Sequence, residues 1–262
     1  MKYFIVTGSN RGLGFNLVEQ LLQPEHCVIA IARSHPDIQS EEAIKNGAKL
    51  VKITAGLADT NDIKRASEEA VLAILEDATA VYLINNAATF QPAGLAESMM
   101  AEQVSEAFNL NVVAPTVLTA AIIGKFQDAP FVKRIVNLSS GAGKRPIEGW
   151  SVYCATKAAI DLYTQTVGKE QDLKAKQASA AGRAFYPVEI TAFSPGVIDT
   201  GFQEQVRLLD AKDFPNIAQF HALKNQGQLR SPETVASSII SLLLGSGFEQ
   251  GGLQDIKQFD AQ

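Results

Sequence analysis

Residues 3–14 read YFIVTGSNRGLG, a short apolar run that passes directly into a glycine-rich turn. The apolar run predicts a buried strand, and residues 13–22 repeat apolar side chains at the three- and four-residue spacing of a helix. Glycine lets a backbone turn tightly and approach a pyrophosphate, to which the first turn of a helix offers free N–H groups. The spacing of Gly8, Gly12 and Gly14 is Gly-x-x-x-Gly-x-Gly, not the commoner Gly-x-Gly-x-x-Gly. A loop that merely turns the chain would contain the same glycines, so this segment needs support from the rest of the chain.

The rest of the chain alternates short apolar runs with longer segments of helical period. Strands are predicted at 3–7, 27–31, 49–53, 80–84, 132–138, 188–193 and 253–256. Helices are predicted at 13–22, 59–77, 98–126 and 152–170, with 171–184 as either an exposed helix extension or a loop. This alternation predicts an α/β fold: a single doubly wound Rossmann-type domain over 1–262, with a mainly parallel sheet of about seven strands.

Composition and charge exclude several classes of protein. The chain has 262 residues and a formal net charge of -5, which argues against nucleic acid or an anionic membrane surface as a partner. It contains no run of 18 or more consecutive apolar residues and no signal-peptide pattern, so we expect no membrane partner and a cytoplasmic location. Two cysteines, Cys27 and Cys154, do not predict a disulfide framework, and the histidines lack metal-ligand spacing, so no metal is expected.

The end of the second predicted strand indicates which dinucleotide the turn would bind. A carboxylate at this place binds the ribose 2′-hydroxyl of NAD, whereas an arginine accommodates the 2′-phosphate of NADP. Here the strand leads into Arg33 with no acid before Asp37, and Arg11 adds a cation from the glycine turn. A guanidinium can hold a phosphate through two parallel hydrogen bonds. We therefore favour NADP(H), over the alternative that both arginines are solvated surface residues.

Tyr153 and Lys157 lie four residues apart, and Ser139 ends the predicted strand 132–138. The phenol of a free tyrosine has a pKa of about 10, which is too high for ready proton exchange at neutral pH. On a helix the Lys157 ammonium lies one turn along, and we expect it to lower the pKa of Tyr153 and make the phenol a general acid for a ketone oxygen that receives hydride. Ser139 is placed to hydrogen-bond the same oxygen.

These motifs, in this order, resemble the short-chain dehydrogenase/reductase family over essentially the whole chain. The matching residues are Thr7, Gly8, Gly12, Gly14, Asn85, Asn86, Ala87, Asn111, Ser139, Tyr153, Lys157, Pro195, Gly196 and Thr200. The resemblance implies a nicotinamide cofactor, Tyr153 as proton donor, Ser139 as the residue that orients the substrate, and a second role for Lys157 at the nicotinamide ribose. It also implies that Asn111 anchors a water in the proton relay; the alternative is a polar residue that bonds its own helix backbone.

The resemblance also implies where the cofactor binds. The implied residues are Gly8, Asn10, Arg11, Gly12, Leu13, Gly14, Arg33, Asn86, Ala87, Tyr153, Lys157, Pro195, Gly196, Val197 and Thr200. Two positions depart from the family pattern. Ala88 stands where a glycine is usual, and Gly56 stands where an aspartate usually lies near the adenine. Adenine recognition is then expected to fall to backbone groups.

Residues 139–146, 149–154, 196–203 and 214–220 resemble a narrower group, that of benzil reductases and sepiapterin reductases. The bacterial benzil reductases that form (S)-benzoin are similar in length. This resemblance implies an NADPH-dependent reductase of ketones or aromatic 1,2-diketones, a small-molecule carbonyl substrate, and substrate contacts from Ser139, Tyr153, Trp150 and Phe202. Trp150 has the alternative of a core packing residue. Residues 206–220 are predicted to form a flap over the substrate.

Two other functions stay open. A sepiapterin-type reductase requires a buried carboxylate in the flap region, for which Asp199, Glu204, Asp210 and Asp213 are the candidates. A binding protein that senses NADP(H) without turnover is a remote alternative, since such proteins typically lose the tyrosine or the lysine. The helices at 98–126 and 152–170 are expected to form the interface of a homo-oligomer, a dimer in preference to a tetramer.

Overall fold

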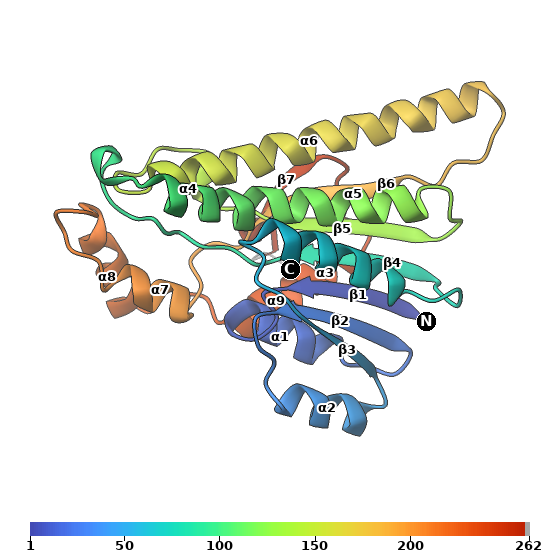
Figure 1. Cartoon of the computed structure of the whole chain (residues 1–262), viewed down its shortest axis with the longest axis horizontal. Helices are drawn as coiled ribbons and strands as arrows, with labels where there is room; N and C mark the ends of the chain where they lie inside the picture. The colour runs from blue at the N-terminus through green and yellow to red at the C-terminus, as the bar shows by residue number, and fades with distance from the viewer. Residues whose placement is uncertain (260–262) are drawn as a thin grey trace.

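The predicted sheet is confirmed in the computed structural model, which describes residues 1–259 (Figure 1). Its strands are β1 (Lys2–Thr7), β2 (His26–Ala32), β3 (Lys49–Thr54), β4 (Ala80–Asn85), β5 (Val132–Leu138), β6 (Val188–Ser194) and β7 (Gly252–Asp255). All neighbours pair in parallel, in the order β3-β2-β1-β4-β5-β6-β7. The connections diverge between β1 and β4, which is where ligands bind in sheets of this kind.

The helices are α1 (Gly12–Leu21), α2 (Ile38–Asn46), α3 (Thr60–Leu72), α4 (Ala101–Phe108), α5 (Ala114–Phe126), α6 (Ser151–Ala180), α7 (Gly201–Val206), α8 (Ile217–Asn225) and α9 (Pro232–Leu244). Short 3-10 turns are η1 (Ala96–Ser98), η3 (Gly141–Gly143) and η4 (Ile256–Phe259). Of the two possibilities for residues 171–184, the helix extension is the one observed as far as Ala180. The predicted flap 206–220 runs from the last residue of α7 to the first turn of α8; both helices lie beyond the carboxyl ends of the strands in Figure 1.

Two apolar layers cover the sheet. Successive side chains of a strand point to opposite faces, so Phe4 and Val6 of β1 join one layer whereas Tyr3 and Ile5 join the other. The first layer contains buried residues of α1, α2 and α9, and the second contains those of α3, α5 and α6. Because both faces are covered, the central strands β1, β2 and β4 are mostly apolar, as is usual in a parallel sheet.

The helical segment 101–126 passes through a π-helical turn, η2 (Asn109–Val113), between α4 and α5. By length and mean hydropathy alone this segment could cross a membrane. In the fold it lies against the sheet, where Ala114, Leu118, Ile122 and Phe126 belong to the buried core. A π turn shifts the helix face locally and is frequent at functional sites, and this one carries Asn111.

Candidate active site

A cavity of about 1430 Å³ opens at the carboxyl ends of the strands. Every residue that the sequence predicted for cofactor or substrate lines it. These are Gly8, Asn10, Arg11, Gly12, Leu13, Gly14, Arg33, Asn86, Ala87, Ser139, Trp150, Tyr153, Lys157, Pro195, Gly196, Val197, Thr200 and Phe202. Asn111 is the one predicted site residue that does not line the cavity.

The glycine turn is built by close backbone approach. A Cβ at Gly14 would lie 2.1 Å from the Gly8 carbonyl oxygen, and Gly8 and Gly12 have φ of 66° and 54°, which disfavour any side chain. The Asn86 side chain donates a 2.8 Å hydrogen bond to the Thr7 carbonyl and so ties the turn to the end of β4. The α1 helix begins at this turn without a side-chain cap. Its first N–H groups therefore face the cavity mouth with no side chain competing for them.

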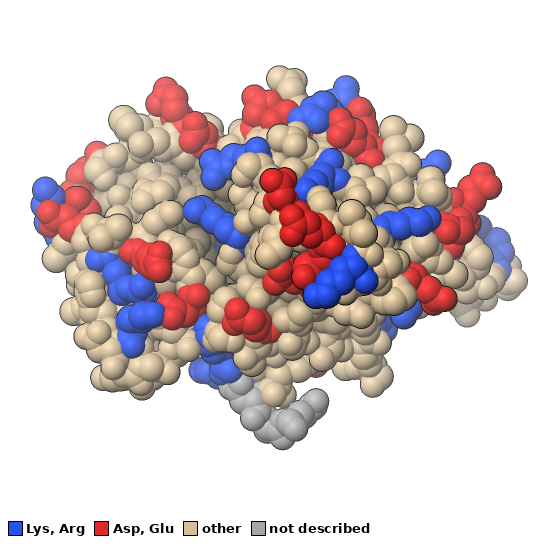
Figure 2. Space-filling view, turned by 90° about the horizontal axis from the view of Figure 1, so that it is seen from below, with Lys and Arg blue, Asp and Glu red and all other residues tan. Residues whose placement is uncertain are grey.

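The charge around the cavity is opposite to that of the whole chain. The basic side chains that line it are Arg11, Arg33, Lys144, Arg145, Lys157, Arg230 and Lys257, against Glu106 and Asp255. Seen from below, the molecule has basic side chains at the edge of a recess, while acidic and basic side chains are mixed over the rest of that face (Figure 2). In a chain with a formal net charge of -5 overall, a basic cavity suits an anionic ligand. The glycine turn and these charges fit a phosphorylated dinucleotide.

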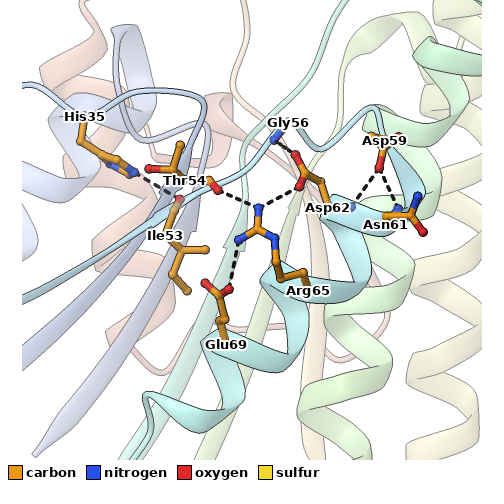
Figure 3. A network of polar contacts seen from close by, with 9 residues as sticks. All are labelled: His35, Ile53, Thr54, Gly56, Asp59, Asn61, Asp62, Arg65 and Glu69. Carbon is orange, nitrogen blue, oxygen red and sulfur yellow. Dashed lines mark hydrogen bonds and ion pairs between the residues drawn. The ribbon is translucent and has the colours of Figure 1, made fainter.

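Acidic residues near Gly56 are engaged in structural bonds (Figure 3). The Gly56 N–H donates to Asp62 at 2.7 Å, and Arg65 donates both to Asp62 at 2.8 Å and to Glu69 at 3.0 Å. The hydrogen bonds from Arg65 and Gly56 hold the pKa of Asp62 below its usual value. Asp59 accepts hydrogen bonds from the N–H groups of Asn61 and Asp62 as the N-cap of α3. Asp59 is thus a helix cap and does not replace the missing aspartate.

Ser139, Tyr153 and Lys157 all line the cavity. The Ser139 N–H donates to the Phe193 carbonyl at 2.8 Å, which fixes the end of β5 beside β6. Lys157 lies one turn after Tyr153 on α6, with its Nζ 5.8 Å from the tyrosine ring centroid. The same Nζ donates to the Leu138 carbonyl at 2.7 Å. All three side chains are buried, and the Ser139 hydroxyl has no hydrogen-bond partner of standard geometry among the described residues.

Burial governs the ionisation of this group. It raises the pKa of Tyr153 to about 12, with a smaller opposing effect from the Ser140 hydroxyl, and it lowers the pKa of Lys157 to about 8. The expectation that Lys157 lowers the tyrosine pKa is therefore wrong for the protein without cofactor, because desolvation of the phenolate dominates. At neutral pH the phenol holds its proton, which is the form that a proton donor to a ketone requires.

Asn111 joins two segments that flank the catalytic residues. Its Oδ1 accepts from the Thr89 N–H at 2.9 Å, and its Nδ2 donates to the Thr89 carbonyl at 2.7 Å and to the Thr156 hydroxyl at 3.0 Å. The side chain therefore does not bond its own helix backbone, and that alternative is wrong. It ties the loop after β4 to α6 beside Lys157, while its part in a proton relay stays a prediction.

An aromatic group surrounds the outer end of the cavity. Trp150 lies 5.2 Å from Tyr153 and 5.3 Å from Phe220 between ring centroids, and Phe90 lies 4.8 Å from Phe202. Trp150 is buried and also lines the cavity, so it both packs and faces the ligand space. Phe220 belongs to the predicted flap 206–220, whereas Phe90 was missed, since a single aromatic residue in a loop carries no local signal of a pocket shared with distant residues.

The candidate acids for a pterin site lie elsewhere. Asp199 pairs with Lys224 at 2.5 Å and Asp210 with Lys212 at 3.7 Å, and Glu204 is exposed. None of these, nor Asp213, lines the cavity. Among the described residues the flap thus supplies no buried carboxylate to this space.

The fold and this constellation are those of a nicotinamide-dependent oxidoreductase, and the chain belongs to the short chain dehydrogenase family, whose model matches residues 2–210. It is 37% identical to the benzil reductase ((S)-benzoin forming) of Bacillus cereus over 96% of this chain and 97% of that protein. It is 34% identical to the benzil reductase ((S)-benzoin forming) of Bacillus subtilis (strain 168) over 99% and 100%. It is 28% identical to the sepiapterin reductase of Meriones unguiculatus over 96% and 94%.

Solved structures agree on the fold. The KRED1-Pglu enzyme superposes with a TM-score of 0.78 at 24% identity, covering 97% of this chain and 100% of that one. A short chain dehydrogenase from Burkholderia cenocepacia in complex with NADP superposes with a TM-score of 0.70 at 22% identity, covering 97% of this chain and 96% of that one. The 4-hydroxyisoleucine dehydrogenase complexed with NADH superposes with a TM-score of 0.76 at 21% identity, covering 97% of this chain and 96% of that one. The fold is therefore compatible with either dinucleotide, and the choice rests on the side chains of this chain.

Proposed function

We propose that this protein is an NADPH-dependent carbonyl reductase that acts on ketones and aromatic 1,2-diketones. The observation that carries the proposal is one cavity with two different ends. The glycine turn with Arg11 and Arg33 forms one end, the aromatic side chains form the other, and Ser139, Tyr153 and Lys157 line the same cavity. The identity to benzil reductases over nearly the whole chain supports the same substrate class.

The proposed reaction delivers a hydride to the carbon and a proton to the oxygen of one carbonyl group. The nicotinamide supplies hydride to the carbonyl carbon when it is bound. Tyr153 gives its phenolic proton to the carbonyl oxygen, and its raised pKa keeps that proton available at neutral pH. The Ser139 hydroxyl donates a hydrogen bond to the same oxygen as negative charge develops. Lys157 keeps a positive charge beside the phenol below a pH of about 8, which favours proton release from Tyr153 in the transition state.

Arg11 and Arg33 support NADP(H) over NAD(H). Both line the cavity at the end of β2, together with Gly56 and Ala32, and no carboxylate among the described lining residues comes from β2 or β3. A 2′-phosphate carries about two negative charges near neutrality and matches paired guanidinium groups. The ribose 2′-hydroxyl of NAD would find no acceptor of the usual kind here.

The alternatives are weaker on specific grounds. A pterin substrate would need a buried acid in the flap, and the acids that line the cavity, Glu106 and Asp255, come from α4 and β7. A binding protein without turnover has no need of a buried tyrosine and lysine on one helix face, because burying an ammonium is costly. We keep both as outcomes of the assay below.

We also propose a cytoplasmic homo-oligomer, most simply a dimer. Cys27 and Cys154 are free thiols, in keeping with a reducing compartment. Apolar side chains such as Met100 before α4, and Leu162 and Leu173 on α6, are more than half exposed in the single chain, which favours contact with a second copy. Light scattering on the purified protein tests this, and a monomeric mass would contradict it.

The function is tested by the initial rate of absorbance loss at 340 nm with NADPH and then NADH, against benzil and against sepiapterin. We expect NADPH-dependent reduction of benzil. Turnover of sepiapterin alone would transfer the proposal to the pterin alternative. Tight NADPH binding without turnover of any carbonyl compound would favour the binding protein.

A further inference from the structure

Asp161 is a buried carboxylate that the mechanism above does not use. Its relative exposure is 5%, and neither carboxylate oxygen has a hydrogen-bond partner of standard geometry among the described residues. A buried charge is strongly unfavourable unless other charges or dipoles compensate it. The residue therefore needs an explanation, and the charged groups around it supply one.

Its position on α6 places it directly behind the catalytic residues. Tyr153, Lys157 and Asp161 follow at four-residue intervals and so share one helix face. On the other side lies the η3 turn, where a Cβ at Gly143 would come within 2.9 Å of the Asp161 Oδ2. Glycine at 143 thus leaves the space that the carboxylate occupies. Asp161 does not line the cavity, so it acts on the site only through its neighbours.

Two cations and one hydroxyl act on the ionisation of this carboxylate. The pKa of Asp161 is raised on balance, because burial outweighs the opposing effects of Ser139, Lys144 and Lys157. In return, Asp161 raises the pKa of Lys157 against the larger effect of burial. Tyr153 and Cys154 are the other titratable groups at this end of α6, and the pKa of each is raised mainly by burial. Asp161 is thus the anion among the groups that act on Lys157.

We propose that Asp161 is a positioning residue of the active site, an anion that keeps Lys157 protonated. The proposal rests on the proposed function, because Lys157 is assigned its role there. Without the carboxylate no anion acts on Lys157, and the buried lysine releases its proton more readily. The alkaline limit of the reaction is therefore set by Asp161 through Lys157.

The kinetic test compares the wild type with Asp161→Asn, which keeps the shape of the side chain and removes its charge. A plot of the logarithm of kcat/KM for carbonyl reduction against pH should be flat below the pKa of Lys157, about 8, and should have a falling alkaline limb above it. In D161N we expect this limb to move to lower pH by about one unit, so that activity falls by about eightfold at pH 8.5 and by less than about twofold at pH 6. Asp172→Asn, the same change at an exposed position of α6, is the matched control and should leave the limb in place. An unmoved limb in D161N would overturn the proposal.

A second measurement uses the wild type and needs neither a variant that folds nor turnover. In protein labelled with ¹³C at the aspartate carboxyl carbons and the lysine Cε, we expect the Asp161 carboxyl to be ionised from pH 6 to 8 and Lys157 to titrate near 8. A protonated Asp161 throughout this range would overturn the proposal, since no anion would then act on Lys157. Because the spectrum does not depend on catalysis, absence of carbonyl reduction by the wild type would contradict the proposed function and leave this test standing.

Discussion

The two ends of the cavity are built in different ways. The basic end is formed by backbone: Gly8, Gly12 and Gly14 shape one continuous turn, and a Cβ at Gly14 would overlap the Gly8 carbonyl. The aromatic end is formed by side chains from four distant parts of the chain, Phe90, Trp150, Phe202 and Phe220. The glycines of the first end tolerate almost no substitution and suit the pyrophosphate of any dinucleotide, whereas the second end can change its side chains while the fold persists. The difference indicates which end is common to a family and which sets the substrate.

The largest effect is expected at Tyr153, where a substitution should separate catalysis from cofactor binding. Tyr153→Phe removes the phenolic proton and keeps the ring that packs against Trp150. We expect kcat to fall about 10³-fold, the typical worth of a general acid, with NADPH affinity changed less than about twofold. Initial-rate assays at 340 nm measure kcat, and titration of NADPH fluorescence measures the NADPH affinity. Unchanged turnover would show that another group donates the proton.

Gly14→Ala tests whether the basic end depends on backbone approach. The new methyl would lie 2.1 Å from the Gly8 oxygen, so the turn must move. We expect loss of NADPH binding and a decrease of about 3 kcal/mol in the free energy of unfolding, as for severe overpacking. Gly124→Ala on α5, where a Cβ meets nothing within 4 Å, is the control and should stabilise the helix by up to about 1 kcal/mol. Similar denaturation midpoints for the two variants would contradict the steric explanation.

Arg33→Ala tests whether any side chain of the basic end distinguishes cofactors. Loss of a charge-assisted contact with the 2′-phosphate should cost about 2 kcal/mol, which is about a 30-fold rise in the Kd of NADPH. The Kd of NADH should change less than about threefold, because NADH lacks that phosphate. Calorimetric titration with each cofactor gives both numbers. Equal weakening would mean that Arg33 supports the turn in general.

The smallest effect is expected at the aromatic end, where neighbouring rings share the contact. Trp150→Phe removes part of the ring surface and the indole N–H, and we expect the KM for benzil to rise about fivefold, near 1 kcal/mol for one aromatic contact. Butane-2,3-dione, which has no phenyl ring, is the control substrate and should change little. An equal rise for both diketones would show that Trp150 holds the pocket together without selecting the substrate.

Sequence reasoning succeeded where a local pattern reflects a local structure. All seven strands were predicted within one or two residues because buried parallel strands are continuous apolar runs. Helix α2 (Ile38–Asn46) was not predicted: it buries only Gln39 and Ala43, so it has no apolar period to detect. The extension of α6 to Ala180 was left open for the same reason, since beyond Glu170 it buries only Gln171 and Ala178.

In the candidate site the same limit applies to side chains. The residues that line the basic end were predicted because they belong to contiguous motifs. Phe90 was missed, as was Asp161, because their importance arises from neighbours far apart in the chain or from burial, which no local pattern encodes. The ionisation of Tyr153 was misjudged because desolvation depends on the packing around it.

The strand order has a consequence for how the chain is made. β1 leaves the ribosome first but lies in the middle of the sheet, where Lys2 pairs with His26 on one side and with Ala80 on the other. Its second neighbour is synthesised much later, and β6 gains β7 only after residues 252–255 have been made. Long-range parallel pairing of this kind is slow, and unpaired apolar strands tend to aggregate. We therefore expect newly made chains to need protection by chaperones until residues 252–255 have emerged.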